Sequence, residues 1–107
     1  MRDIDQYGEW TESTAVYPEA TGLQYLITGL TGEVGEFNSV MAKKYRRDHD
    51  NADFTENVKK ELGDIAWFWA QLCRAFGHNP SEVLAANVAK LEDRKARGVL
   101  KGSGDNR

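Results

Sequence analysis

The sequence predicts an all-α protein with a single domain. Apolar residues recur every three or four positions through three long segments, the spacing of helices with one buried face. No segment shows the apolar–polar alternation of a strand. The chain of 107 residues has the length of one domain. We divide it into an N-terminal short helix and loop (1–17), a helical core (18–97) and a basic, glycine-rich tail (98–107).

The first helix is expected over residues 3–13, with Asp3 as its N-cap. Ile4, Tyr7 and Trp10 recur at three-residue spacing and give this helix an apolar face. Trp10 suits two roles, because a large ring can anchor the packing or form a stacking wall for a flat ligand.

The second helix is expected from about Pro18 to Arg46, since proline is tolerated in the first turn of a helix. Its predicted buried stripe consists of Leu23, Leu26, Ile27, Leu30, Val34, Phe37 and Met41. Four glycines, at 22, 29, 32 and 35, each cost about 1 kcal/mol relative to alanine in a helix. They predict close approach of another helix or a ligand, or else a break near Gly29.

The third helix is expected from about Phe54 to Phe76, after a polar connection and a cap at Asp53 or Thr55. Three consecutive rings at residues 67–69 widen its apolar side until the helix is apolar almost all round. Such a helix is buried, either in a bundle or at a subunit interface. Oligomerisation is therefore expected to complete the small bundle.

The last helix is expected from about Ser81 to Arg97, with Ser81 as its N-cap and Gly98 at its end. Its expected packing residues are Val83, Leu84, Ala86, Val88 and Leu91. Composition predicts that the tail at 102–107 is flexible.

Bulk composition excludes several classes of protein. A net charge of −3 does not favour binding of a nucleic-acid polymer. No apolar run approaches the roughly 20 residues that span a membrane, and no signal peptide precedes the first helix. Cys73 is the only cysteine, so an internal disulfide cannot form, and we expect a reducing cytoplasmic location.

Two acidic pairs lie among glycines and apolar residues: Glu33 with Glu36, and Glu61 with Asp64. Carboxylates three residues apart share one face of a helix, so two adjacent helices would gather four of them. Crowded carboxylates repel one another, and a divalent cation removes that cost. Oxygen ligands of this kind suit Mg²⁺, with Mn²⁺ as an alternative. Di-iron and zinc sites are disfavoured because His and Cys ligands with suitable spacing are absent.

These motifs, together with Asn87-x-x-Lys90-Leu91-x-x-Arg94, resemble the MazG-like family of all-α nucleoside triphosphate pyrophosphohydrolases. The resemblance covers about residues 20–97, and the tail also resembles the end of small phage and bacterial members. It implies hydrolysis of an NTP or dNTP to the monophosphate and pyrophosphate, with a house-cleaning role in nucleotide pools. The implied fold is a helical bundle assembled as a homodimer or homotetramer.

The resemblance also implies roles for individual residues. Glu33, Glu36, Glu61 and Asp64 are expected to hold the metal, and Glu36 and Glu33 are the expected catalytic residues. One of the four acids, with Glu36 preferred, could orient the attacking water instead of binding the metal. The phosphate ligands are expected among Asn87, Lys90, Arg94, Lys43, Lys101 and Arg107. Lys43 could instead only complement the helix dipole. The expected base pocket consists of Trp10, Tyr25 and Trp67.

Two other readings of the sequence remain open. The chain could be an enzyme like the phosphoribosyl-ATP pyrophosphohydrolase of histidine synthesis, which has a similar helical build. It could also be a helical interaction protein without enzymatic activity, such as an antitoxin-like or scaffold dimer, which would need no Mg²⁺.

Overall fold

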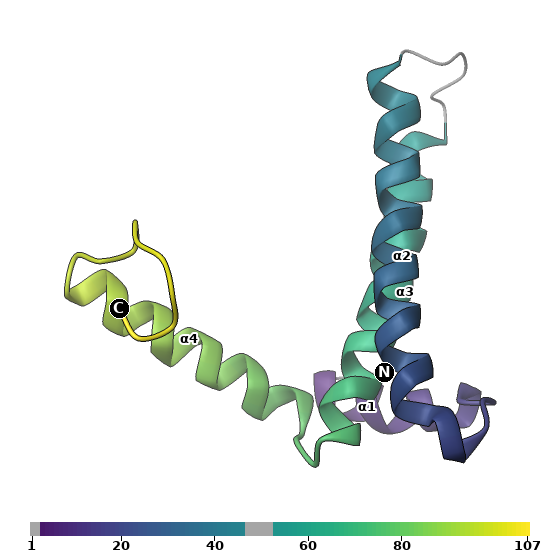
Figure 1. The fold of residues 1–107 in the computed structure, drawn as a ribbon, viewed down its shortest axis with the longest axis horizontal. Coiled ribbons are helices and arrows are strands. Elements are labelled where there is room, and N and C mark those ends of the chain that lie inside the picture. The colour runs from purple at the N-terminus through teal and green to yellow at the C-terminus, as the bar shows by residue number, and fades with distance from the viewer. Residues whose placement is uncertain (1–2, 47–52) are drawn as a thin grey trace.

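The computed structural model describes residues 3–46 and 53–107 (Figure 1). These residues form four α-helices and no strand, which confirms the all-α prediction. The helices are α1 (Ile4–Thr11), α2 (Gly22–Tyr45), α3 (Phe54–Ala75) and α4 (Pro80–Ala96), with short 3-10 turns at Glu12–Thr14 and Glu19–Thr21. Most of the predicted polar connection before α3 lies outside the described residues. Of these four helices, none is both long and apolar enough to cross a membrane.

Helices α2 and α3 pair along their length and form the main body of the molecule (Figure 1). A Cβ added at Gly29 would lie 2.2 Å from Cε1 of Phe68, so only glycine lets this ring pack against the backbone of α2. The close approach predicted for the glycines is therefore correct at Gly29, and α2 continues through this position without a break. At Gly32 and Gly35 an added Cβ meets nothing within 4 Å in this chain, so close approach at these two positions stays a prediction.

A polar network joins α1 and the following turns to α3. The Gln71 Nε2 donates to Thr11 Oγ1 at 2.7 Å, and the Tyr17 hydroxyl donates to Gln71 Oε1 at 2.7 Å. Thr11 and Gln71 are both buried, and these bonds satisfy their polar atoms. At the start of α1, the Asp3 side chain accepts a hydrogen bond from the backbone N–H of Gln6, so the predicted cap is confirmed.

Helix α4 begins one residue earlier than predicted, and Ser81 is not its cap. The N-cap is Asn79, whose backbone N–H donates to Glu82 Oε1 at 3.1 Å in a capping box. The amide of Ser81 donates to Asp5 Oδ1 at 2.8 Å and its hydroxyl to Asp5 Oδ2, which attaches the start of α4 to α1. Sequence spacing identifies a serine at a helix start but gives no sign of this distant carboxylate.

The predicted buried stripe of α2 is only partly buried in a single chain, where Leu30, Phe37 and Met41 are half-buried. Leu26 is buried, whereas Leu23, Ile27 and Val34 are more than two-fifths exposed. The packing predicted for α4 fails in the same way, since Leu84, Val88 and Leu91 are exposed. These residues are exposed because α4 extends away from the α2–α3 pair instead of covering it (Figure 1). The radius of gyration is 17.0 Å, against about 13 Å for a compact domain of this length.

The tail (98–107) is folded back on α4, contrary to the flexibility that its composition predicts. Gly98 adopts a positive φ of 71° and turns the chain at the end of the helix. The guanidinium of Arg107 then donates to the carbonyl oxygens of Val99, Leu100 and Gly104. These hydrogen bonds close the tail into a loop, and composition alone carries no information about them.

Candidate active site

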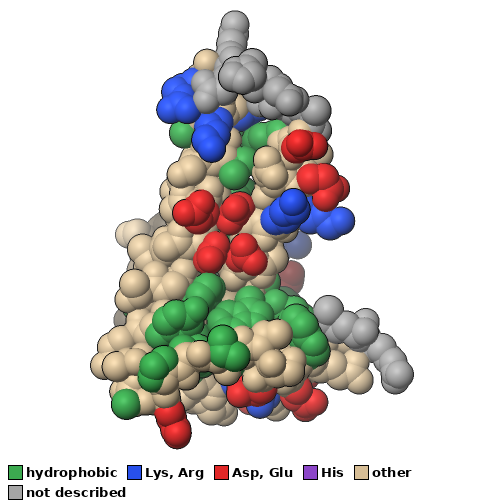
Figure 2. Space-filling view, turned by 90° about the vertical axis from the view of Figure 1, so that its right-hand side faces the viewer, with side chains coloured by type: hydrophobic (Ala, Val, Ile, Leu, Met, Phe, Trp, Pro, Cys, Tyr) green, Lys and Arg blue, Asp and Glu red, His purple; other side chains and the backbone are tan. Residues whose placement is uncertain are grey.

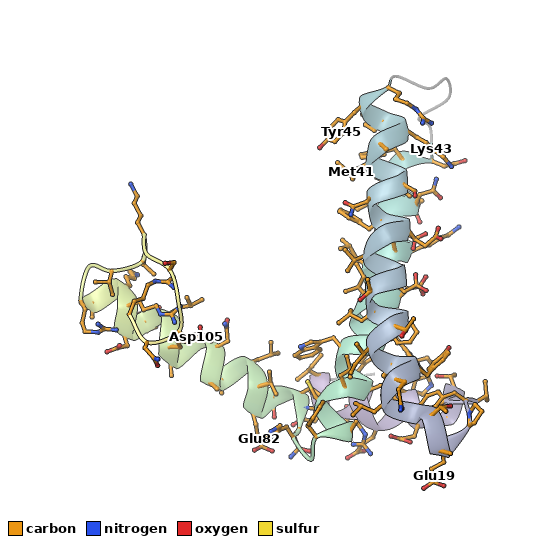
Figure 3. All side chains as sticks on the ribbon, in the orientation of Figure 1. Glu19, Met41, Lys43, Tyr45, Glu82 and Asp105 are labelled. Carbon is orange, nitrogen blue, oxygen red and sulfur yellow. The ribbon has the colours of Figure 1, made fainter. Side chains whose placement is uncertain are left out.

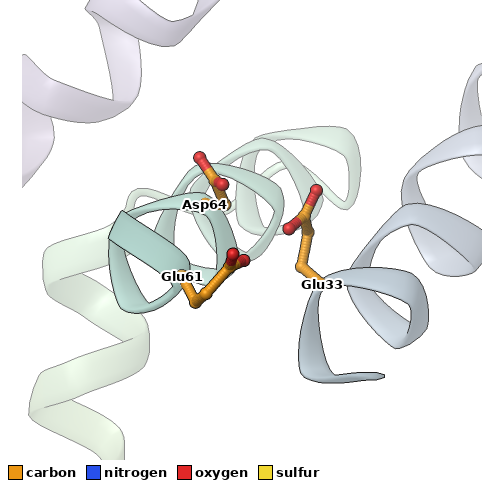
Figure 4. Close-up of side chains that lie close together, drawn as sticks. All are labelled: Glu33, Glu61 and Asp64. Carbon is orange, nitrogen blue, oxygen red and sulfur yellow. The ribbon is translucent and has the colours of Figure 1, made fainter. Parts of the chain in front are cut away.

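Three carboxylates from two helices meet near the middle of the α2–α3 pair. Glu33 projects from α2 toward Glu61 and Asp64 of α3, and one oxygen of each lies within 4.8 Å of the others (Figure 4). The spacing of three residues places Glu61 and Asp64 on one face of α3. The pairing of the helices brings Glu33 onto that face. The structure therefore gathers three of the four predicted acids, drawn from both sequence motifs.

The acidic cluster repels itself. Partial burial raises the pKa of Glu33, and the charges of Asp64 and Glu61 raise it further. A cation held between these oxygens would reverse that effect by favouring the ionised form. Three hard oxygen ligands and no nitrogen or sulfur donor in the group fit Mg²⁺ or Mn²⁺.

Glu36 does not belong to the group of three. It lies one helical turn beyond Glu33 and is exposed. Both residues line a cavity of about 540 Å³ on the α2 side of the cluster. Glu36 thus lines the cavity next to the three clustered oxygens but is not one of the group.

An aromatic cavity adjoins the acidic cluster on its other side. Tyr7, Trp10 and Trp67 line this space of about 500 Å³, and Asp64 forms part of its wall. Figure 2 shows acidic side chains gathered directly beside an apolar patch on one face of the molecule. The Trp67 Nε1 donates to Thr14 Oγ1 at 2.8 Å, which fixes the orientation of its ring. Two of the three predicted base-pocket residues therefore line one cavity.

Tyr25 lies outside this aromatic cavity. Its ring stacks on Tyr17 with 4.7 Å between centroids and also contacts Phe68. It lines the other cavity, together with Glu33 and Glu36. The sequence shows that Tyr25 is on α2 but not which side of the cluster that part of α2 faces.

The cations predicted to bind phosphate are not assembled at the acidic cluster within this chain. Asn87, Lys90 and Arg94 lie on α4, which extends away from the α2–α3 pair (Figure 1). Lys90 and Arg94 are instead bound to Asp105 of the tail. Asn87 is exposed.

The weaker phosphate candidates are also remote from the cluster. Lys43 lies ten residues beyond Glu33, about 15 Å along α2, near the end of the helix pair (Figure 3). Lys101 is exposed in the tail. Arg107 is occupied by backbone carbonyls of the tail, so its observed role is structural.

Sequence reasoning missed Tyr7 and Asp105. Tyr7 was read only as part of a packing face, although it precedes Trp10 by three residues and so shares its side of α1. Burial and the charge of Asp64 raise the pKa of Tyr7, which agrees with its place in the wall of the aromatic cavity. The position of Asp105 depends on the path of the tail, which no local sequence pattern indicates.

Comparison with known proteins identifies the family. The family model of the MazG nucleotide pyrophosphohydrolase domain matches residues 21–99, which include the acids of the cluster and helix α4. The chain belongs to this family. It is also similar to the Gene 37 protein of Mycobacterium phage L5, with 42% identity over 97% of this chain and 98% of that protein. No solved structure matches the chain.

Proposed function

We propose that this MazG-domain protein hydrolyses nucleoside or deoxynucleoside triphosphates to the monophosphate and pyrophosphate in a Mg²⁺-dependent reaction. The observation that carries the proposal is the cluster of Glu33, Glu61 and Asp64 beside an aromatic cavity. A cation-binding group adjacent to a stacking surface matches a ligand with a polyphosphate at one end and a flat ring at the other. Removal of damaged or surplus nucleotides from the pool is the role that this activity serves.

The acidic residues would perform two tasks. Glu33, Glu61 and Asp64 would hold Mg²⁺, which when bound supplies charge neutralisation to a triphosphate that carries about four negative charges. Glu36, outside the tight group and on the wall of the neighbouring cavity, would orient the attacking water and accept its proton. The water oxygen forms a bond to the α-phosphorus as the bond to the β-phosphate oxygen breaks, so pyrophosphate leaves.

The aromatic cavity would hold the base. Stacking on a ring contributes about 1–3 kcal/mol per base and tolerates different bases. Trp67 is oriented by its hydrogen bond to Thr14, and Trp10 is about half exposed, so a ring face is accessible to a ligand. Tyr25 lines the other cavity, together with Glu36, and would therefore lie near the attacking water instead of the base.

A second copy of the chain would complete the site. The accessible surface is 7938 Å², whereas a compact monomer of 12.0 kDa exposes about 6,000 Å². The excess of about 2,000 Å² per chain is of the size that obligate interfaces bury. The exposed apolar faces of α2 and α4 would supply this interface in a homodimer or homotetramer. Asn87, Lys90 and Arg94 on the projecting α4 would then reach the triphosphate at a partner's acidic cluster.

A product assay across the common NTPs and dNTPs, with phosphoribosyl-ATP included, tests the activity. We expect monophosphate and pyrophosphate with Mg²⁺ and no turnover in EDTA. Glu61→Gln should lower turnover by orders of magnitude, whereas Glu56→Gln, an exposed acid in the first turn of α3, should not. Full activity in EDTA, or equal activity of both variants, would refute the metal assignment. Inactivity of the wild type on the whole panel would favour the interaction-protein reading.

Sedimentation at micromolar concentration tests the assembly. We expect at least a dimer, and substitution of an exposed apolar residue of α2, Ile27→Glu, should dissociate it without loss of helicity. A fully active monomer would show that the cations of α4 are not needed from a partner.

A further inference from the structure

The tail places a carboxylate on the two cations that were expected to bind phosphate. Lys90 and Arg94 lie one turn apart on α4, and Asp105 Oδ1 accepts from Lys90 Nζ at 3.2 Å and from Arg94 Nη2 at 3.1 Å. The Gly104 carbonyl oxygen also accepts from Arg94, at 3.4 Å. The Arg94 side chain is only 5% exposed, so the tail covers its guanidinium.

Several contacts fix the path that brings Asp105 to this position. Gly98 and Gly104 both have positive φ values, of 71° and 83°, which bend the tail at its start and directly before Asp105. Arg107 holds three carbonyl oxygens of the tail, and the Arg97 guanidinium donates to the Arg107 carbonyl oxygen at 2.6 Å. The contact between Asp105 and the two cations is thus the product of a folded loop.

We propose that Asp105 is an internal competitor for phosphate: it occupies Lys90 and Arg94 until a phosphate group of the substrate displaces it. This inference rests on the role of Lys90 and Arg94 as phosphate ligands in the proposed function. The tail would therefore lower the affinity of the site for every phosphate anion, the pyrophosphate product included, and would keep the covered guanidinium paired when no nucleotide is bound.

The exposure of the groups makes this exchange feasible. Asp105 is 82% exposed, so its carboxylate returns to water at little cost once it is displaced. Arg94 is buried, and a buried guanidinium without an anionic partner is unfavourable, so an incoming phosphate that replaces Asp105 keeps this charge paired. Phosphate offers more charge and more acceptor oxygens than a carboxylate. Hydrogen bonds from Arg94 and Lys90 hold the pKa of Asp105 below its usual range, so the competitor is charged at neutral pH.

Binding of inorganic pyrophosphate to the full-length protein in EDTA tests the proposal without any turnover. Titration calorimetry at fixed ionic strength should show that Asp105→Asn binds pyrophosphate about two- to fivefold more tightly than wild type, as expected for loss of a mostly exposed ion pair. The matched control is Asp93→Asn, which removes the same charge from the same region. The Asp93 carboxylate pairs with Arg97 and, among the described residues, forms no ion pair with Lys90 or Arg94, so this variant should bind like wild type or only slightly more tightly.

A second measurement separates competition from unfolding of the tail. Side-chain NMR resonances of Lys90 and Arg94 should shift on addition of pyrophosphate in both proteins, and at lower concentrations in Asp105→Asn. Lys90→Ala in that background should abolish the gain in affinity. Equal or weaker binding by Asp105→Asn than by Asp93→Asn would overturn the proposal, as would the absence of any pyrophosphate effect on Lys90 and Arg94. Turnover of nucleotides, measured separately, would still stand or fall on its own.

Discussion

Substitution of Gly29 by alanine is expected to destabilise the α2–α3 pair, although alanine is the better helix former. The added Cβ would lie 2.2 Å from Cε1 and 2.4 Å from Cζ of Phe68. Ordinary carbon–carbon contacts are about 3.5–4.0 Å, so the ring or the helix must move by about 1.3 Å or more. Phe68 is buried and its ring contacts Trp67 and Tyr25, which restricts such a movement.

Two opposing effects determine how much Gly29→Ala changes the free energy of unfolding. Alanine gains about 1 kcal/mol over glycine in a helix interior. Overpacking of a core costs typically about 1–3 kcal/mol, and a clash with several ring atoms belongs at or above the upper end of that range. The expected net loss for Gly29→Ala is therefore about 2 kcal/mol. Gly35→Ala is the matched control, because its Cβ meets nothing within 4 Å and only the gain of about 1 kcal/mol remains.

Thermal melts followed by circular dichroism in EDTA, at one low protein concentration, compare the two variants. The difference of about 3 kcal/mol corresponds to about 12–24 °C in Tm for a domain of this size. Gly29→Ala should melt below wild type and Gly35→Ala above it. If Gly29→Ala melts as high as Gly35→Ala, the packing of Phe68 against the backbone of α2 is refuted.

Three further predictions concern the site and the attachment of α4. In EDTA, the raised pKa of Glu33 means that the folded state holds the Glu33 proton more strongly than the unfolded state. The contribution of Glu33 to the free energy of unfolding is therefore fully present below the ordinary pKa of 4.5 and is lost as the pH rises through the folded-state pKa. Wild type should therefore lose more stability than Glu33→Gln between about pH 4.5 and pH 7 in urea titrations, and an equal loss would contradict the electrostatic reading. Trp10→Ala should raise KM by about tenfold through lost stacking, with kcat little changed; an unaltered KM would move the base elsewhere. Ser81→Ala should increase hydrogen exchange in the first turn of α4 before that of α3, because the hydroxyl bond to Asp5 is lost.

The sequence predicted those features that depend on neighbours along the chain. The helix end at Gly98 was predicted correctly because a left-handed residue after a helix strongly favours glycine. Three of the four acids were predicted correctly as a group, since the spacing of Glu61 and Asp64 fixes a common face of α3. The position of Glu36 outside the tight group was not, because it depends on the rotation of α2 about its own axis relative to α3.

Contacts between residues far apart in sequence were not predictable. The bond of Ser81 to Asp5 replaces a local cap with a carboxylate from α1, and nothing near Ser81 indicates that choice. The tail presents a similar case. Its glycines suggest flexibility, yet Arg107 organises it through backbone carbonyls that any residues could provide.

Helical periodicity identifies an apolar face but not the chain that covers it. The stripe of α2 is predicted to be a core, and within one chain its members Ile27 and Val34 are exposed because α4 extends outward. The same geometry keeps the two charged groups of the proposed site apart. Among the described residues, Glu33 lies with Glu61 and Asp64, whereas Lys90 and Arg94 are on the projecting α4 and pair with Asp105 of the tail. A partner chain that covered the apolar stripe would also bring α4 to the acidic cluster, so under our proposal assembly and formation of the active site are a single event.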